Sequence, residues 1–143
     1  MKQLILTLIL VTLVTPAICF GEWTYVTESM DEDRTTTFYV DLERIRERDG
    51  YVYYWELHNY PEREQNRGLA NSMSSKVYWQ GDCDLFRRNP LTKSDFSQPM
   101  GEGSPRKALD NPSQNWGYPL PDSTAEATLK AVCDYVESKQ NQK

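Results

Sequence analysis

The feature that most restricts the fold is the order of the secondary-structure signals along the chain. Short runs rich in β-branched and aromatic residues come first, at 22–28, 35–41, 51–60, 72–79 and 83–88. Their connections are short and hold no crossover helix, which favours antiparallel pairing. The pattern predicts an α+β fold, with an antiparallel β-sheet and a C-terminal α-helix packed on it.

The helix signal lies near the end of the chain. Ser123 and Glu126 form a Ser-x-x-Glu capping box, and we expect the chain to fray after Ser138. An apolar stripe recurs at helical spacing. It consists of Ala125, Leu129, Val132, Cys133 and Val136.

Turn residues mark the boundaries of the strands. Asp49-Gly50 predicts a tight turn, and Asp41 is expected to cap a short helical turn over 42–45.

Between Ser94 and Pro121 the chain holds five prolines and three glycines. We expect no regular structure there.

The run 51–60 alternates as a strand does, so its two faces can be separated. One face carries Tyr51, Tyr53, Trp55 and Leu57, and the other carries Val52, Tyr54, Glu56 and His58. We expect Trp55 and Leu57 inside, with Tyr54 and His58 on the outer, less apolar face.

The N-terminus has the layout of a secretory signal peptide. Lys2 precedes the apolar run Leu4–Val14, and Pro16 and small residues follow. We expect 1–21 to be a signal peptide and 22–143 to form a single domain.

The processing site has two candidates. Cleavage after Gly21 would start the mature chain at a strand, and cleavage after Ala17 is the alternative. An uncleaved anchor is a further possibility, but the apolar run is shorter than the ~20 residues that a span needs. We therefore expect no stable membrane span.

Export would place the remaining cysteines where they can form a disulfide. If Cys19 leaves with the signal peptide, Cys83 and Cys133 remain in an oxidising compartment, where they are expected to form a disulfide. The closed loop of about 50 residues would contribute roughly 4 kcal/mol. The alternative is two buried free thiols.

Signals for catalysis or cofactors are sparse. His58 is the single histidine, which excludes histidine-based metal clusters, and no serine elbow motif accompanies it. The acidic run 31–33 lacks the spacing of a calcium loop. We predict no catalytic residues, no metal and no cofactor, although the sequence does not exclude a site made of two paired carboxylates.

The net charge of −5 argues against nucleic acid as a partner.

Surface features favour binding. Basic residues lie in two charged segments, and the outer strand face adds two further candidates. The predicted binding residues are Tyr54, His58, Arg63, Arg67, Arg87 and Arg88. Exposed strand edges also permit a homodimer by sheet pairing.

Scattered residues follow the order of a known family. Trp23 opens the first strand, Tyr39-Val40-Asp41 precedes Ile45, and Trp55-Glu56-Leu57 precedes Asn59-Tyr60. The later matching residues are Ser72, Asp82-Cys83, Met100, Trp116, Pro121 and Cys133. The chain resembles the surface-adhesin protein E-like family of Gram-negative bacteria over nearly all of 22–137.

This resemblance implies an antiparallel sheet whose C-terminal helix is fixed by a disulfide. It also implies an exported protein, periplasmic or on the outer cell surface, that attaches to host proteins. We therefore expect a non-enzymatic binding protein. The alternatives are a periplasmic carrier for an aromatic or haem-like molecule, and a carboxylate-based envelope enzyme.

Overall fold

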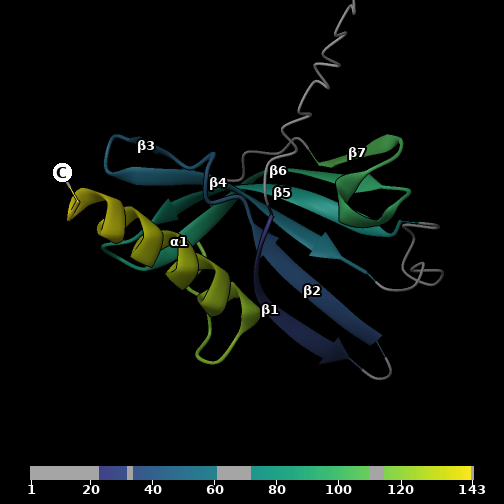
Figure 1. Cartoon of the computed structure of the whole chain (residues 1–143), viewed down its shortest axis with the longest axis horizontal. Helices are drawn as coiled ribbons and strands as arrows, with labels where there is room; N and C mark the ends of the chain where they lie inside the picture. The colour runs from purple at the N-terminus through teal and green to yellow at the C-terminus, as the bar shows by residue number, and fades with distance from the viewer. Residues whose placement is uncertain (1–22, 32–33, 61–71, 110–114, 143) are drawn as a thin grey trace, which may run out of the picture.

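Seven strands build one antiparallel sheet, and a single long helix follows them in the part of the chain that the structure describes (Figure 1). The structure is a computed structural model, and it describes residues 23–31, 34–60, 72–109 and 115–142. The strands are β1 (Thr24–Asp31), β2 (Arg34–Val40), β3 (Arg46–Arg48), β4 (Tyr51–Asn59), β5 (Ser74–Asp82), β6 (Arg87–Phe96) and β7 (Pro105–Leu109). A 3-10 turn, η1 (Pro99–Gly101), precedes β7, and the helix is α1 (Thr124–Gln140). The predicted fold class is confirmed.

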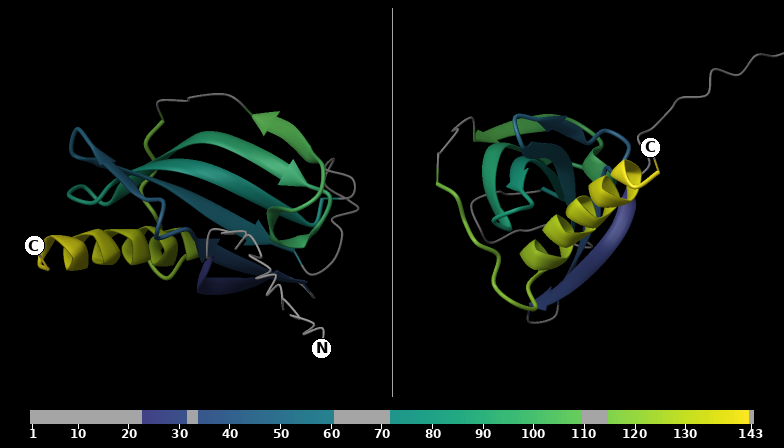
Figure 2. Two further views of the ribbon diagram at one scale, coloured as in Figure 1. Left: turned by 45° about the horizontal axis from the view of Figure 1, so that its top comes forward. Right: turned by 90° about the vertical axis from the view of Figure 1, so that its left-hand side faces the viewer.

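The strand order in the sheet is β1-β2-β4-β5-β6-β7, and β3 pairs with β4 beside this path. The sheet curves, and α1 lies along the side formed by β1, β2 and β4 (Figure 2). The end strands β1 and β7 each have a neighbour on one side only among the described strands. The expected homodimer stays a prediction. No helix of the described residues is long and apolar enough to cross a membrane.

The region of 83–121 is more regular than the sequence indicates. The expected strand at 83–88 begins only at Arg87, because the Asp82 carboxylate accepts the backbone N–H of Leu85 at 3.0 Å and holds a turn. Strand β6 then runs to Phe96, and η1 and β7 follow, so the expected irregularity is wrong for 94–109, whereas 115–121 forms no strand or helix, as expected. Prolines fit here because Pro90 lies where the pairing with β5 shifts register and Pro105 is the first residue of β7.

The predicted turns are present. Asp49 and Gly50 both have positive φ, 53° and 81°, as a two-residue hairpin between β3 and β4 requires. Asp41 accepts the backbone N–H of Arg44 at 3.1 Å, so it caps a turn as expected, but no helix follows.

Helix α1 begins as its capping box predicts. The Ser123 hydroxyl accepts the N–H of Glu126 at 3.2 Å, and the Glu126 carboxylate accepts the N–H of Asp122 at 2.8 Å. The helix continues two residues past the expected fraying point, to Gln140. That side chain donates a hydrogen bond to Glu47 of β3 at 3.0 Å.

The core lies between α1 and the inner face of β2 and β4. Its buried members are Val40, Val52, Tyr54, Leu129, Val132 and Val136. The apolar stripe of the helix is thereby confirmed as the packing face. Each such side chain contributes about 1.5–3 kcal/mol when fully buried. The helix approaches β5 so closely that a Cβ on Gly81 would lie 3.0 Å from Leu129 Cδ1.

The two faces of β4 are reversed relative to the expectation. Tyr54 is 0% exposed and belongs to the core, whereas Trp55 is only half-buried on the face away from the helix. Leu57 is buried as expected but lies outside this core cluster. The helix packs on the face of Val52 and Tyr54, although Glu56 and His58 make that face the less apolar one in sequence.

The predicted disulfide is present. Cys83 and Cys133 are bonded, with 5.7 Å between their Cα atoms. The bond joins the turn after β5 to the middle of α1. It therefore closes a loop of 50 residues across the helix–sheet interface.

Replacing both cysteines by alanine should lower the free energy of unfolding by about 4 kcal/mol, because the unfolded chain regains the entropy of the opened loop. The urea midpoint should fall and the slope should rise, because the unfolded chain without the cross-link exposes more surface. The exposed pair Leu85→Ala and Met30→Ala serves as a control for simple truncation. An unchanged midpoint in the cysteine variant would contradict the role given to the disulfide.

Candidate functional site

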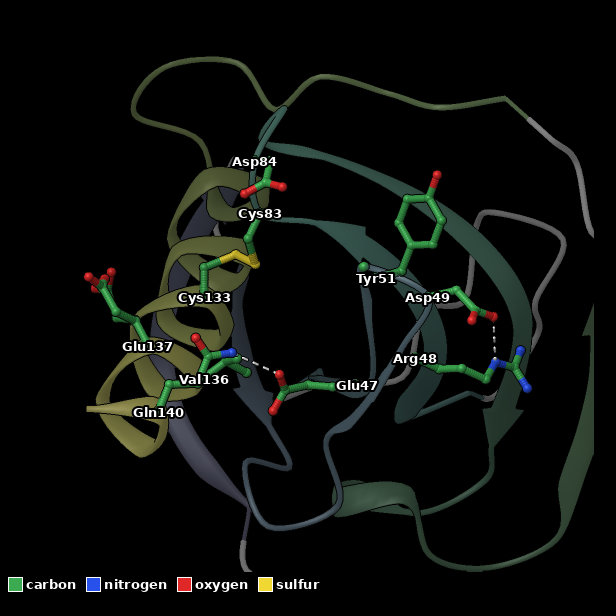
Figure 3. Close-up of a pocket in the computed structure, with 12 residues that line it drawn as sticks. Glu47, Arg48, Asp49, Tyr51, Cys83, Asp84, Cys133, Val136, Glu137 and Gln140 are labelled. Atoms are coloured by element: carbon green, nitrogen blue, oxygen red, sulfur yellow. Dashed lines mark hydrogen bonds and ion pairs between the residues drawn. A yellow bond between two sulfur atoms is a disulfide. The ribbon is translucent and has the colours of Figure 1, made fainter. Parts of the chain in front are cut away.

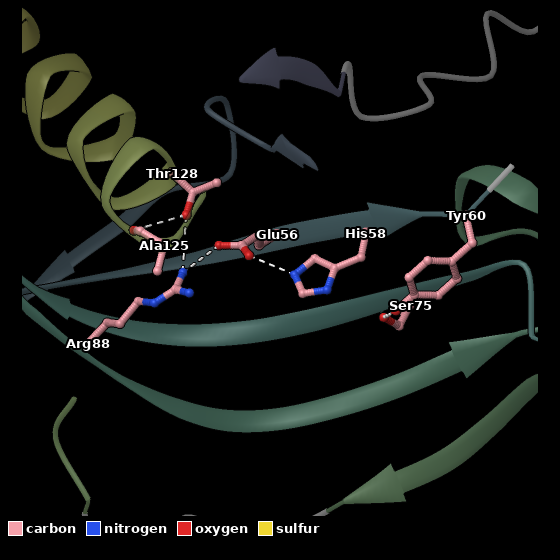
Figure 4. A network of polar contacts seen from close by, with 7 residues as sticks. All are labelled: Glu56, His58, Tyr60, Ser75, Arg88, Ala125 and Thr128. Atoms are coloured by element: carbon pink, nitrogen blue, oxygen red, sulfur yellow. Dashed lines mark hydrogen bonds and ion pairs between the residues drawn. The ribbon is translucent and has the colours of Figure 1, made fainter. Parts of the chain in front are cut away.

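A buried polar network connects β4, β6 and α1 (Figure 4). The Arg88 guanidinium donates to the Glu56 carboxylate at 2.8 Å and to the Thr128 hydroxyl at 3.1 Å. The other Glu56 oxygen lies 2.7 Å from His58 Nε2. The network thus places one carboxylate between two basic groups, with Thr128 attaching it to the helix.

Aromatic rings enclose the network. The Arg88 guanidinium carbon lies 3.9 Å from the centre of the Trp79 ring, and the His58 ring lies 4.7 Å from that of Phe38. A cation over a tryptophan face is attracted by the ring quadrupole. Trp79 therefore holds Arg88, and Phe38 holds His58.

Glu56 stays ionised despite its burial. Burial alone would raise its pKa, but the hydrogen bond from His58 and the positive charge of Arg88 outweigh that effect. The net result is a pKa below the ordinary value of 4.5. A general acid near neutral pH needs the opposite shift. The geometry therefore gives Glu56 a structural role.

His58 also lacks the partner that nucleophilic catalysis needs. Ser75 lies directly opposite His58 on β5, but its hydroxyl pairs with Tyr60 at 2.9 Å. Among the described residues, the contacts of His58 are with Glu56 and Phe38 and not with a serine hydroxyl. No group of three or more His, Cys, Asp or Glu among those residues is placed to hold a metal ion.

A hollow of about 620 Å³ lies beside the disulfide, between the β3–β4 hairpin and the C-terminal half of α1 (Figure 3). Five acidic residues line it: Glu47, Asp49, Asp84, Asp134 and Glu137. In Figure 3 Glu47 points toward the helix, and Arg48 and Tyr51 point away from it. The hollow is polar, unlike a pocket for an apolar carrier ligand.

A second, mostly apolar groove of about 370 Å³ lies at the other end of the helix. Trp79 and Pro90 of the sheet form one wall, and the segment 117–120 forms the other. Two backbone hydrogen bonds of 2.9 Å between Arg88 and Gly117 attach this segment to β6. We call this feature the apolar groove.

Two large apolar side chains stand exposed at the apolar groove. Tyr118 is 65% and Leu120 is 74% exposed, and both line it. Contiguous apolar surface of this kind marks interaction sites on soluble proteins. Sequence analysis missed both residues, because the proline-rich segment carries no periodicity that separates exposed from buried positions.

The structure separates the predicted binding residues. Tyr54 is in the core and cannot contact a partner, and burial, followed by the nearby charge of Glu56, raises its pKa well above 10.0. His58 and Arg88 belong to the buried network, and Arg88 also lines the apolar groove. Arg87 binds Asp82 at 2.9 Å on the opposite face of β6. Arg63 and Arg67 lie outside the described residues.

Comparisons with known proteins identify the class. Residues 23–134 match the model of the family described as surface-adhesin protein E. The chain belongs to this family. A comparison with curated proteins finds no match.

Solved structures show the same fold. The chain is 16% identical to protein E of Haemophilus influenzae, with a TM-score of 0.56 over 79% of this chain and 86% of that one. A second crystal form gives 16% identity and a TM-score of 0.55 over 77% and 87%. Protein E from a non-typeable strain gives 15% and 0.55 over 87% and 83%.

Replacing Glu56 by glutamine should lower the free energy of unfolding at pH 7 on the order of 3 kcal/mol, because Arg88 keeps a buried charge without its partner. Chemical denaturation of both proteins measures the loss. Lys130→Gln, which removes an exposed ion pair with Asp134, should cost no more than about 0.5 kcal/mol.

The stability gap between the wild type and E56Q should depend on pH. The folded pKa of Glu56 is lowered, so its contribution is fully present above the unfolded value near 4.5 and is lost as pH falls through the folded pKa. The gap should therefore narrow below pH 4.5. A gap that stays constant down to the acid transition would contradict the lowered pKa.

Proposed function

We propose that this chain is an exported, non-enzymatic binding protein that attaches to host proteins at the cell surface. Membership of the surface-adhesin protein E family supports this role. The signal-peptide pattern of 1–21 supports export, with the mature domain starting at residue 22.

The apolar groove is the proposed protein-docking site, and its exposed pair Tyr118 and Leu120 is the observation that carries the proposal. Tyrosine at the edge of an apolar depression is a frequent anchor of protein interfaces. Arg88, at the base, supplies one polar group, and its charge is already balanced by Glu56. Arg63 and Arg67 remain predicted contacts of the charged loop.

The two alternatives have less support. The space between helix and sheet is filled by Tyr54, Leu129 and Val132, which leaves no enclosed apolar chamber for a carrier ligand in that core. For an envelope enzyme, Glu56 and Asp82 have pKa values shifted downward, away from the range of a general acid.

Intact cells that express the full chain should bind to at least one protein of a panel of purified extracellular-matrix proteins. The double variant Tyr118→Ala/Leu120→Ala should weaken the interaction at least tenfold, because it removes both exposed anchors. Biolayer interferometry with the exported, processed protein gives the affinities.

The matched control is Leu85→Ala, which truncates an exposed apolar side chain that does not line the apolar groove. It should change the affinity less than twofold. If no matrix protein binds the wild type, the adhesin role is wrong. If binding survives in the Tyr118/Leu120 variant, the docking site is elsewhere.

A further inference from the structure

The face of the sheet away from the helix carries a row of aromatic side chains. Because Val52 and Tyr54 face the core, the alternating residues Tyr51, Tyr53 and Trp55 of β4 face away from it. Tyr78 of β5 lies directly opposite Trp55. Cross-strand partners share a face, so Tyr78 belongs to the same row.

The rings of this row contact one another. The ring centres of Trp55 and Tyr78 are 4.8 Å apart, and those of Tyr53 and Tyr78 are 6.4 Å apart. Tyr51 continues the row to Trp116, with 5.3 Å between the ring centres. All five rings are half-buried, so each keeps part of its surface open to solvent.

Guanidinium groups lie along the same row. Arg46 pairs with Tyr53 and Arg48 with Tyr51 across the β3–β4 ladder. The Arg48 guanidinium carbon lies 5.1 Å from the centre of the Tyr53 ring. Arg46 and Arg48 are two residues apart on an extended strand, which separates them by about 7 Å.

At the other end of the row Arg87 repeats this arrangement. Its guanidinium carbon lies 4.6 Å from the centre of the Trp116 ring. We call the five rings with Arg46, Arg48 and Arg87 the arginine–aromatic strip.

The positive charge of the strip is only partly balanced. Arg48 is 72% exposed, and its ion pair with the exposed Asp49 has a long N–O distance of 3.6 Å. Arg46 is exposed and makes no ion pair with the described residues, whereas Arg87 is paired with Asp82. A pair as exposed as Arg48–Asp49 contributes little and yields to a stronger anion.

We propose that the arginine–aromatic strip binds a sulfated polysaccharide. Arginine donates paired hydrogen bonds to anionic oxygens while its plane rests on an aromatic ring, which is the arrangement seen at Arg48 and Arg87. The rings of the strip, which extend past Arg46 to Trp55 and Tyr78, offer flat apolar faces on which the C–H faces of sugar rings can stack. The protein has a net charge of −5, so the attraction is local to the strip.

An acidic polypeptide satisfies these groups less well. It supplies carboxylates for the arginines but no flat apolar face for the row of rings between them. The strip and the apolar groove are built from different residues, and Arg87 and Arg88 face opposite sides of the sheet. The two surfaces adjoin, because Tyr118 of the groove also acts on Arg87. The heparin test therefore changes Arg46, Arg48 and Tyr53, which do not line the groove, so its outcome can be told apart from that of the protein-docking site.

The test is binding of the exported, processed protein to immobilised heparin at low ionic strength, with neutral dextran as the blank. Wild type should bind heparin and not dextran, and Arg46→Gln/Arg48→Gln should weaken binding at least tenfold. Lys130→Gln/Lys139→Gln removes two charges from the helix and should change binding less than twofold. Circular dichroism confirms that each variant is folded.

The contribution of the rings is tested at Tyr53. Tyr53→Leu should weaken heparin binding several-fold, because it removes the flat ring face but keeps an apolar side chain. Failure of wild type to bind heparin, or equal binding by R46Q/R48Q, overturns the proposal. Equal affinity for polyglutamate also overturns it and favours an acidic polypeptide. Equal affinity for polyphosphate, which has no sugar rings, together with no effect of Tyr53→Leu, also overturns the proposal, because it leaves only unspecific charge attraction.

Discussion

The buried carboxylate of Glu56 is the constraint on which the arrangement of helix and sheet depends. A charge in the interior is tolerated only with partners on all its oxygens; here these are His58 of the same strand and Arg88 of β6, and Arg88 is bonded in turn to Thr128 of α1. Arg88 must reach Glu56 from β6, and Thr128 must meet Arg88 from α1. The position of the helix along the sheet is thus set by polar geometry as well as by the apolar core. The disulfide then fixes the middle of the same helix.

The binding surfaces follow from this arrangement. With Arg88 turned inward over Trp79, the next residue, Arg87, necessarily faces the other side of the sheet. The inward side of β5 and β6 ends in the apolar groove, and the outward side carries the arginine–aromatic strip. An adhesin with two separate surfaces could engage a protein and a glycan of the same host matrix together, which increases avidity when both sites are reached.

Much of the fold could be predicted from the sequence, because strong local signals mark it. The Asp49-Gly50 turn, the capping box at Ser123 and the Cys83–Cys133 pair are all where the sequence indicates. The faces of β4 could not be assigned, since Trp55 and Leu57 look as apolar as Val52 and Tyr54. The signal that decides between them is Glu56, a buried charge whose partner Arg88 is 32 residues away and invisible to local patterns. The apolar groove was not predicted either, because the segment that forms one of its walls has no periodicity that marks exposed positions.

The protonation of Glu56 tests this account most directly, because an ionised Glu56 holds the helix on the sheet whereas a protonated one would be a candidate acid catalyst. The measurement is the carboxyl ¹³C chemical shift of Glu56 followed by NMR from neutral pH into the acid range. We predict an inflection below 4.5, the ordinary value for this group. An inflection well above 4.5, toward neutral pH, would contradict the account and favour the carboxylate enzyme instead.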